Sequence, residues 1–312
     1  MTPPFSFFKT YDDLSIRYAV RLCRSEQKAG SLILLGGRRE FIEKYTETIA
    51  ELNGRNFDVY AMDWRGQGLS GRQLPNRHKG YVRSYDDYLE DLNRFFREVI
   101  QPRAVLPCII LAHSMGGHIA LRYLHDHPDC VAKAILTAPM IDIALSPFKV
   151  LLIRVFARFA VSAGMDKAYV QGSGDYRAVD QNFNGNRLTS DPRRFTDEQR
   201  AIHANPDLAL GGVTYGWLKA TLESIDILKG TGYPEAIRTP VLIVGADCDR
   251  VVSLKSQEQI CERLPFGRIR IIPQARHEVL KETDQVRGLF WQAFDRFVET
   301  QREPLKHHDD IA

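Results

Sequence analysis

A serine flanked by small residues is the first feature of the sequence that suggests chemistry. Ser114 stands between Ala112 and Gly116 in LAHSMGG, after the apolar run 108–111 and before residues with helical spacing. Small residues two positions before and after a serine permit the sharp strand-to-helix turn called a nucleophile elbow, although Ala112 stands where glycine is usual. The string alone arises by chance in roughly one such chain in five. Its position between strand and helix therefore carries the prediction of a nucleophile.

A serine nucleophile needs a general base, and the base needs an acid that orients it. His277 follows the apolar run 269–272, and Asp247 and Asp249 follow the run 241–244. The order Ser, Asp, His along the chain is that of the α/β-hydrolases. We therefore predict a triad of Ser114, His277 and an aspartate, with Asp249 preferred to Asp247.

The tetrahedral intermediate needs hydrogen-bond donors for its oxyanion. One is the amide of Met115, which follows the nucleophile, and the second is expected from the loop after the apolar run 32–35. We assign the second donor to the Arg38 amide, and expect Gly37 to let the backbone approach the substrate. The sequence has no Cys/His spacing for zinc and no phosphate or dinucleotide loop, so we expect neither metal nor cofactor.

The order of apolar runs predicts the elements that hold these residues. Six short runs have the composition of buried parallel strands: 32–35, 59–62, 108–111, 134–136, 241–244 and 269–272. Residues 15–24 alternate as a half-exposed strand, and residues 84–99 have helical spacing. Strands alternating with helices predict an α/β fold, with a mostly parallel central sheet and helices on both faces.

The alternation stops after residue 139 and resumes near residue 239. We therefore predict one catalytic core made of residues 1–140 and 239–305, interrupted by an inserted helical cap, residues 141–238. The charged segment 306–312 is expected to be disordered.

The most apolar part of this insertion is residues 147–163. Three cations are interspersed in it: Lys149, Arg154 and Arg158. One interpretation is a basic amphipathic surface that takes up lipid from a membrane and lines an acyl tunnel. The other is a cap helix packed on the core with solvated arginines. Leu152, Phe156 and Trp217 are the candidate substrate-binding residues of the cap.

Composition limits the class of partner. The 312 residues carry 42 Lys+Arg and 39 Asp+Glu, a net charge of +3, which argues against a nucleic-acid partner. Five cysteines without a paired spacing favour a reducing compartment. With neither a secretory signal nor an uncharged run of spanning length visible, we expect a cytoplasmic protein, with peripheral contact to an anionic inner membrane face as an option. The oligomeric state stays open.

Five segments together resemble the lysophospholipase and monoacylglycerol lipase branch of the α/β-hydrolases: GGRREFIEKY, MDWRGQGLSGR, LAHSMGG, GADCDRVV and ARHEVLKE. Where that branch has HG followed by Glu, this chain has Gly36 and Glu40, which is closer to the bacterial lysophospholipases. The insertion segment 184–218 also looks like the cap of that bacterial group. The DRVV match favours Asp249 as the acid.

This resemblance, which extends from about residue 30 to 298, implies a serine hydrolase that cleaves a lipid ester, lysophospholipid or monoacylglycerol, through an acyl-enzyme on Ser114. A short-chain carboxylesterase and an aminopeptidase-like serine hydrolase are the alternatives within the same chemistry. A non-enzymatic ligand receptor on a hydrolase scaffold is the alternative outside it.

Overall fold

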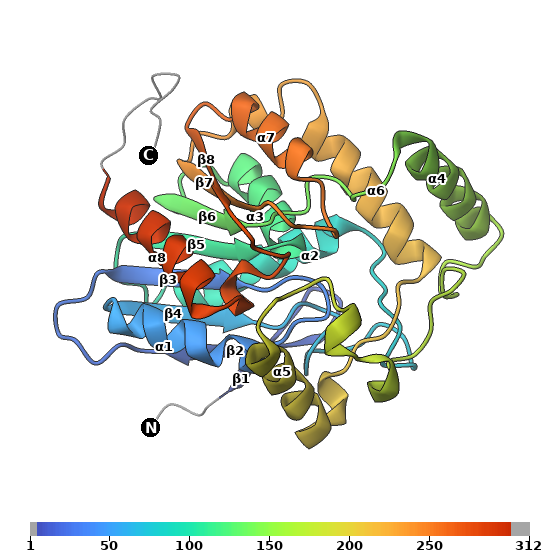
Figure 1. Cartoon of the computed structure of the whole chain (residues 1–312), viewed down its shortest axis with the longest axis horizontal. Coiled ribbons are helices and arrows are strands. Elements are labelled where there is room, and N and C mark those ends of the chain that lie inside the picture. The colour runs from blue at the N-terminus through green and yellow to red at the C-terminus, as the bar shows by residue number, and fades with distance from the viewer. Residues whose placement is uncertain (1–4, 301–312) are drawn as a thin grey trace.

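The computed structural model describes residues 5–300 (Figure 1). The segment 306–312 lies outside the described residues, as do the last residues assigned to the core, 301–305. Within the described part of the chain, no helix combines the length and the apolar character needed to cross a membrane.

A single eight-stranded sheet forms the centre, in the order β1-β2-β4-β3-β5-β6-β7-β8. Strand β2 pairs antiparallel with both β1 and β4, and every other pairing in the sheet is parallel. The strands are β1 (Ser6–Lys9), β2 (Ser15–Arg21), β3 (Gly30–Leu35), β4 (Phe57–Met62), β5 (Cys108–His113), β6 (Lys133–Thr137), β7 (Val241–Ala246) and β8 (Gly267–Ile272). All six predicted parallel strands and the predicted half-exposed strand are confirmed. Strand β1 was not predicted.

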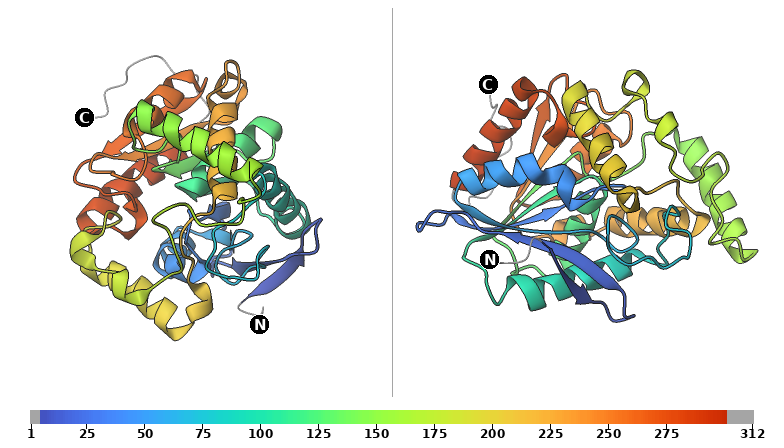
Figure 2. Two further views of the ribbon diagram at one scale, coloured as in Figure 1. Left: turned by 90° about the vertical axis from the view of Figure 1, so that its right-hand side faces the viewer. Right: turned by 90° about the horizontal axis from the view of Figure 1, so that it is seen from below.

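Helices cover both faces of the sheet because the central strands are buried on both sides. Helices α1 (Thr46–Gly54) and α8 (Asp284–Glu299) pack into one apolar cluster. The opposite cluster contains α2 (Tyr85–Arg94), the π-helix η2 (Phe95–Ile100), α3 (Met115–Asp126) and α7 (Leu254–Arg263). Figure 2 shows α1 and α2 on opposite sides of the strands. The α/β-hydrolase architecture expected from the sequence is therefore the observed one.

Between β6 and β7 the chain leaves the sheet. It forms α4 (Pro147–Ser162), α5 (Pro192–Ala204) and α6 (Tyr215–Lys229), joined by loops and by the short helices η3 (Ala178–Asp180), η4 (Phe183–Gly185), η5 (Pro206–Leu208) and η6 (Pro234–Ala236). Trp217 and Leu228 of α6 belong to the main core cluster. Helix α4 packs on α6 and stands at the periphery in both figures. The three helices are thus held to the core to different degrees.

The parallel register brings the carboxyl ends of the strands to one edge. Leu35 pairs with Ala112, His113 pairs with Thr137, and Ala246 pairs with Ile272. Residues that follow β3, β5, β7 and β8 therefore meet at that edge, which is where open α/β sheets bind their ligands.

Candidate active site

The predicted nucleophile lies in a strained turn. Ser114 joins β5 to α3 with φ 52° and ψ −116°, a positive φ that a non-glycine residue adopts at a cost of roughly 1–3 kcal/mol. Its amide donates to Thr137 O at 3.0 Å, and its carbonyl accepts from the His118 and Met140 amides. Ala112 is fully buried, so its methyl group is accommodated in the elbow. These bonds hold the strained residue in place and direct Oγ toward His277.

The sequence-predicted base and acid lie next to this serine. His277 Nε2 is 2.9 Å from Ser114 Oγ, and His277 Nδ1 is 2.7 Å from Asp249 Oδ2. The other Asp249 oxygen accepts from the Val251 and Val252 amides. Burial alone would raise the pKa of Asp249, but its bond to His277 and these amides outweigh burial and lower the pKa. Asp249 therefore stays ionised and can orient the His277 ring.

The other candidate acid is placed differently. Asp247 is exposed at the end of β7, and the structure gives it no hydrogen bond to His277. The Asp249 side chain, by contrast, has no exposed surface. The geometry thus favours Asp249 over Asp247 as the acid that orients His277, a choice that the residues alone left open.

Of the two predicted oxyanion donors, Met115 directly follows the serine, and Arg38 follows Gly37, which packs against the serine. Met115 begins α3, and Gly37 packs so tightly that a Cβ on it would lie 3.1 Å from Ser114 Cβ and from His113 Cδ2. This contact places the residue before Arg38 against the nucleophile. Within the described residues neither the Met115 nor the Arg38 amide donates to the protein, so both are available to an oxyanion.

A buried cation that sequence reasoning did not single out supports this site. Lys44 Nζ lies 2.9 Å from Glu40 Oε1, 2.8 Å from Glu198 Oε2 and 2.6 Å from Glu278 Oε1. Glu40 in turn accepts from the Gly37 amide and the Tyr45 hydroxyl. Lys44 therefore connects the oxyanion loop, the residue after His277 and helix α5.

Lys44 faces three carboxylates in this cluster, and the pKa values of two of them, Glu40 and Glu278, shift in opposite directions. Burial would raise the pKa of Glu40, but the Lys44 charge and the Tyr45 and Gly37 donors lower it to about 2. Burial raises the pKa of Glu278 to about 7, since Lys44 only partly offsets it and Glu198 and Glu40 add negative charge. Glu40 is thus the carboxylate that keeps its charge while holding Gly37.

His113 is a second residue whose role the sequence did not indicate. Its ring centre is 4.8 Å from that of His277, and its Nδ1 lies 3.1 Å from Thr137 O and Oγ1. Burial lowers the pKa of His113 to about 4. A neutral His113 adds no charge that would oppose protonation of His277 during catalysis.

The predicted substrate-binding residues separate into two groups. Gly37 touches the serine, and Trp217 is buried in the core with its ring 5.4 Å from the Arg38 guanidinium. Leu152 and Phe156 are 41% and 65% exposed on α4, and so lie on the outer surface. The structure therefore brings only the first pair to the oxyanion loop.

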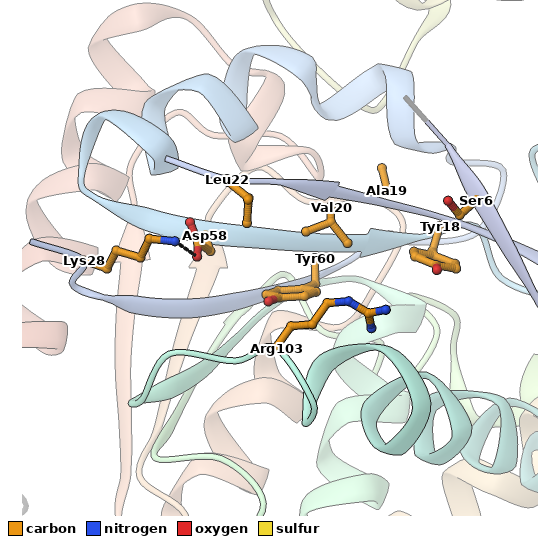
Figure 3. Close-up of a pocket in the computed structure, with 9 residues that line it drawn as sticks. All are labelled: Ser6, Tyr18, Ala19, Val20, Leu22, Lys28, Asp58, Tyr60 and Arg103. Atoms are coloured by element: carbon orange, nitrogen blue, oxygen red, sulfur yellow. Dashed lines mark hydrogen bonds and ion pairs between the residues drawn. The ribbon is translucent and has the colours of Figure 1, made fainter. Parts of the chain in front are cut away.

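Two pockets lie away from the triad. One, of about 360 Å³, is formed by β1, β2, β4 and Arg103, with the Lys28–Asp58 ion pair at its edge (Figure 3). The other, of about 430 Å³, lies between β8 and α8. No His, Cys, Asp and Glu cluster suited to a metal ion occurs among residues 5–300.

The sheet and the serine elbow define the α/β-hydrolase class. The crystal structure of a soluble variant of monoglyceride lipase from Saccharomyces cerevisiae superposes with a TM-score of 0.74 over 94% of both chains at 18% identity. Residues 26–284 match the model of the Hydrolase_4 family, described as serine aminopeptidase, S33. The chain belongs to this family of serine hydrolases.

Curated relatives cover nearly the whole chain. It is 32% identical over 305 residues to lysophospholipase L2 of Escherichia coli, covering 95% of this chain and 88% of the relative. It is 24% identical to monoacylglycerol lipase of Mycolicibacterium smegmatis, covering 82% and 84%. The branch that the sequence motifs resemble is thereby confirmed.

We expect Asp249→Asn to lower kcat for a p-nitrophenyl ester by on the order of 10⁴-fold, because the amide favours the wrong His277 tautomer. Asp247→Asn is the matched control, the same change two residues away at an exposed site. Steady-state kinetics of both variants tests the assignment. A large loss in Asp247→Asn with none in Asp249→Asn would reverse it.

We expect Lys44→Met to destabilise the fold by about 3–5 kcal/mol near pH 8, because three carboxylates are left buried without their cation. Without Lys44, burial holds the folded-state pKa values of Glu40 and Glu278 above those of the unfolded chain. The loss is therefore small below about pH 4 and grows as pH rises. Urea unfolding near pH 5 and pH 8 measures it.

The control is Lys219→Met, which breaks an exposed pair with Glu223 and should cost less than about 1 kcal/mol at either pH. An equal, pH-independent loss in both variants would contradict the role given to Lys44.

Proposed function

We propose that the protein hydrolyses the carboxylic ester of a lysophospholipid or a monoacylglycerol through an acyl-enzyme on Ser114. The observation that carries this proposal is the continuous hydrogen-bond chain from Ser114 Oγ through His277 to Asp249, with steps of 2.9 and 2.7 Å. A receptor on the same scaffold would not need all three residues in this geometry.

In this mechanism His277 Nε2 takes the proton of Ser114 as Oγ attacks the ester carbonyl carbon. The Arg38 and Met115 amides bind the oxyanion that forms. His277 then gives the proton to the leaving glycerol oxygen, and the acyl group stays on Ser114. Water, deprotonated by His277, attacks the acyl carbon; the bond to Ser114 Oγ breaks, His277 returns the proton to Oγ, and the fatty acid leaves. Asp249 holds the Nδ1–H tautomer throughout.

The names of the relatives support a lipid ester as substrate, whereas the family description names an aminopeptidase. An aminopeptidase needs an anion for the substrate amine. The acidic cluster beside Gly37 is already occupied by Lys44, which contacts Glu40, Glu198 and Glu278. This occupation favours the ester over the peptide.

We propose that residues 141–238 act as the cap of this site. Glu278 donates its amide to Leu188 O at 2.8 Å, and Glu198 of α5 reaches Lys44. The Arg38 side chain donates to Gly211 O. These contacts support a cap held against both the histidine loop and the oxyanion loop.

A second part of the proposal is that α4 contacts an anionic membrane surface. One face of α4 packs on α6, but the other carries exposed apolar side chains: Phe148, Leu151, Leu152, Val155, Phe156 and Phe159. Lys149 and Arg158 are exposed among them, while Arg154 pairs with Asp226. An apolar face flanked by exposed cations has the chemistry that an interfacial helix needs.

The substrate proposal is tested with p-nitrophenyl esters of increasing length beside lysophosphatidylcholine, monoacylglycerol and aminoacyl anilides. We expect kcat/KM to rise by about fourfold per buried methylene until the acyl site is full. Ser114→Ala should lose all activity and all labelling by a fluorophosphonate. Hydrolysis of anilides alone would favour the aminopeptidase, and absence of activity on every substrate would favour the receptor.

The membrane proposal is tested by sedimentation with liposomes that contain anionic lipid. Leu152→Ser with Phe156→Ser should lower the bound fraction several-fold, since two apolar side chains no longer enter the interface. Phe7→Ser with Leu106→Ser is the matched control, because these side chains are 57% and 79% exposed outside α4. Equal binding of both double variants would overturn this role of α4.

A further inference from the structure

The half-buried Arg38 side chain has a different setting from three fully buried arginines. Arg17, Arg65 and Arg194 each meet carboxylates, with shortest distances of 2.7, 2.6 and 2.6 Å. No ion pair joins Arg38 to a carboxylate within the described part of the chain. Burial, with the nearby charge of Arg39, lowers the pKa of Arg38 to about 9. Its cation is therefore desolvated without an opposite charge beside it, which is costly in a folded protein.

The guanidinium occupies the seam between core and insertion. It lies over the Trp217 ring at 5.4 Å and donates through Nη2 to Gly211 O. It also lies against Gly80, where a Cβ would approach Nη2 to 2.9 Å and Nε to 3.4 Å. Nε itself is buried and has no hydrogen-bond partner.

Two neighbouring nitrogens share this condition. The Nε2 of Gln67 and the Nδ1 of His78 are also buried without a partner. Gln67 is held beside the loop because its Oε1 accepts from the Arg39 amide, and His78 is held there because its carbonyl accepts from the Gly211 amide. Unpartnered buried polar groups are few in native proteins, so three such nitrogens on residues linked through Arg39 and Gly211 favour an acceptor that the protein does not supply.

This seam is one side-chain length from the reacting centre. The amide of Arg38 is the proposed oxyanion donor, and Gly37 contacts Ser114. In a lysophospholipid the phosphorus is one glycerol backbone from the ester carbonyl carbon, a length comparable to an arginine side chain. An ester placed in the oxyanion site can thus direct its phosphate to the guanidinium.

We propose that the Arg38 side chain, aided by Gln67 and His78, forms a subsite for the phosphodiester of a lysophospholipid. The inference rests on the proposed function and adds a preference between its two candidate substrates. A guanidinium binds phosphate oxygens through charge-assisted hydrogen bonds, and a monoacylglycerol has no anion to offer. Arg38 therefore makes the enzyme prefer lysophospholipid to monoacylglycerol of the same acyl chain.

The test compares kcat/KM for lysophosphatidylcholine and for monoacylglycerol with the same acyl chain. Arg38→Met should lower the lysophosphatidylcholine-to-monoacylglycerol ratio by about 10- to 100-fold, the usual effect of losing charged hydrogen bonds. Arg38→Lys, which keeps the charge but not the fork, should restore part of it. Arg39→Met is the matched control, with the same charge change on the next residue, and should keep the wild-type ratio.

Inhibition identifies the source of the phosphate. Glycerophosphocholine should inhibit the wild type competitively and lose at least tenfold in affinity in Arg38→Met. Inhibition by inorganic phosphate alone, with an unchanged lipid ratio, would indicate a free-phosphate site and overturn the headgroup assignment.

Failure of the proposed function can be distinguished from failure of the subsite alone. If the wild type hydrolyses neither lipid yet reacts with a fluorophosphonate, the proposed function and the subsite both fall. If it hydrolyses both and Arg38→Met lowers both rates equally, with normal thermal unfolding, only the subsite falls.

Discussion

The ion cluster around Lys44 is the interaction on which the site's geometry depends. A single buried ammonium group contacts carboxylates from the oxyanion loop, the histidine loop and α5, all within 2.9 Å. Separating such charges in a buried setting is expensive, so the three segments keep one relative arrangement. The Gly37 amide donates to Glu40, so the ion cluster also fixes the position of the oxyanion loop.

The insertion is attached to this centre along one stretch. The side chain of Thr189 donates to Lys281 O at 2.7 Å, and Arg276 donates to Thr189 O at 2.9 Å. Arg194 contacts Glu47, Asp284 and the carbonyl of Glu282. The start of α5 and the residues before it therefore pack on the segment that carries His277, residues 276–284. Among the described residues, the α4 ion pair Arg154–Asp226 joins α4 to α6 and not to the core, and α4 carries the exposed apolar face. Rigid support and the proposed lipid contact therefore belong to different helices.

The arginines differ in whether a carboxylate lies beside the guanidinium. Arg17, Arg65 and Arg194 neutralise carboxylates and hold loops, which is a structural use of a buried cation. Within residues 5–300 Arg38 has no carboxylate partner, and it follows Gly37, which packs against the nucleophile. The Gly211 carbonyl and the Trp217 ring offset only part of its desolvation, and a negatively charged substrate group would offset the rest.

Local patterns predicted the fold class, the strands, and Ser114 and His277 with two candidate acids. Strands buried on both faces have continuous apolar sequences, and the elbow needs small residues around Ser114. The strand order, the choice of Asp249 over Asp247, and the outward position of Leu152 and Phe156 depended on packing. So did the Lys44 cluster, whose carboxylates lie up to 234 residues away along the chain. The spacing of apolar residues along the sequence indicates only whether a side chain faces solvent or the core. Which distant charges meet is decided by tertiary structure, since the electrostatic energy depends on distance in space and on burial.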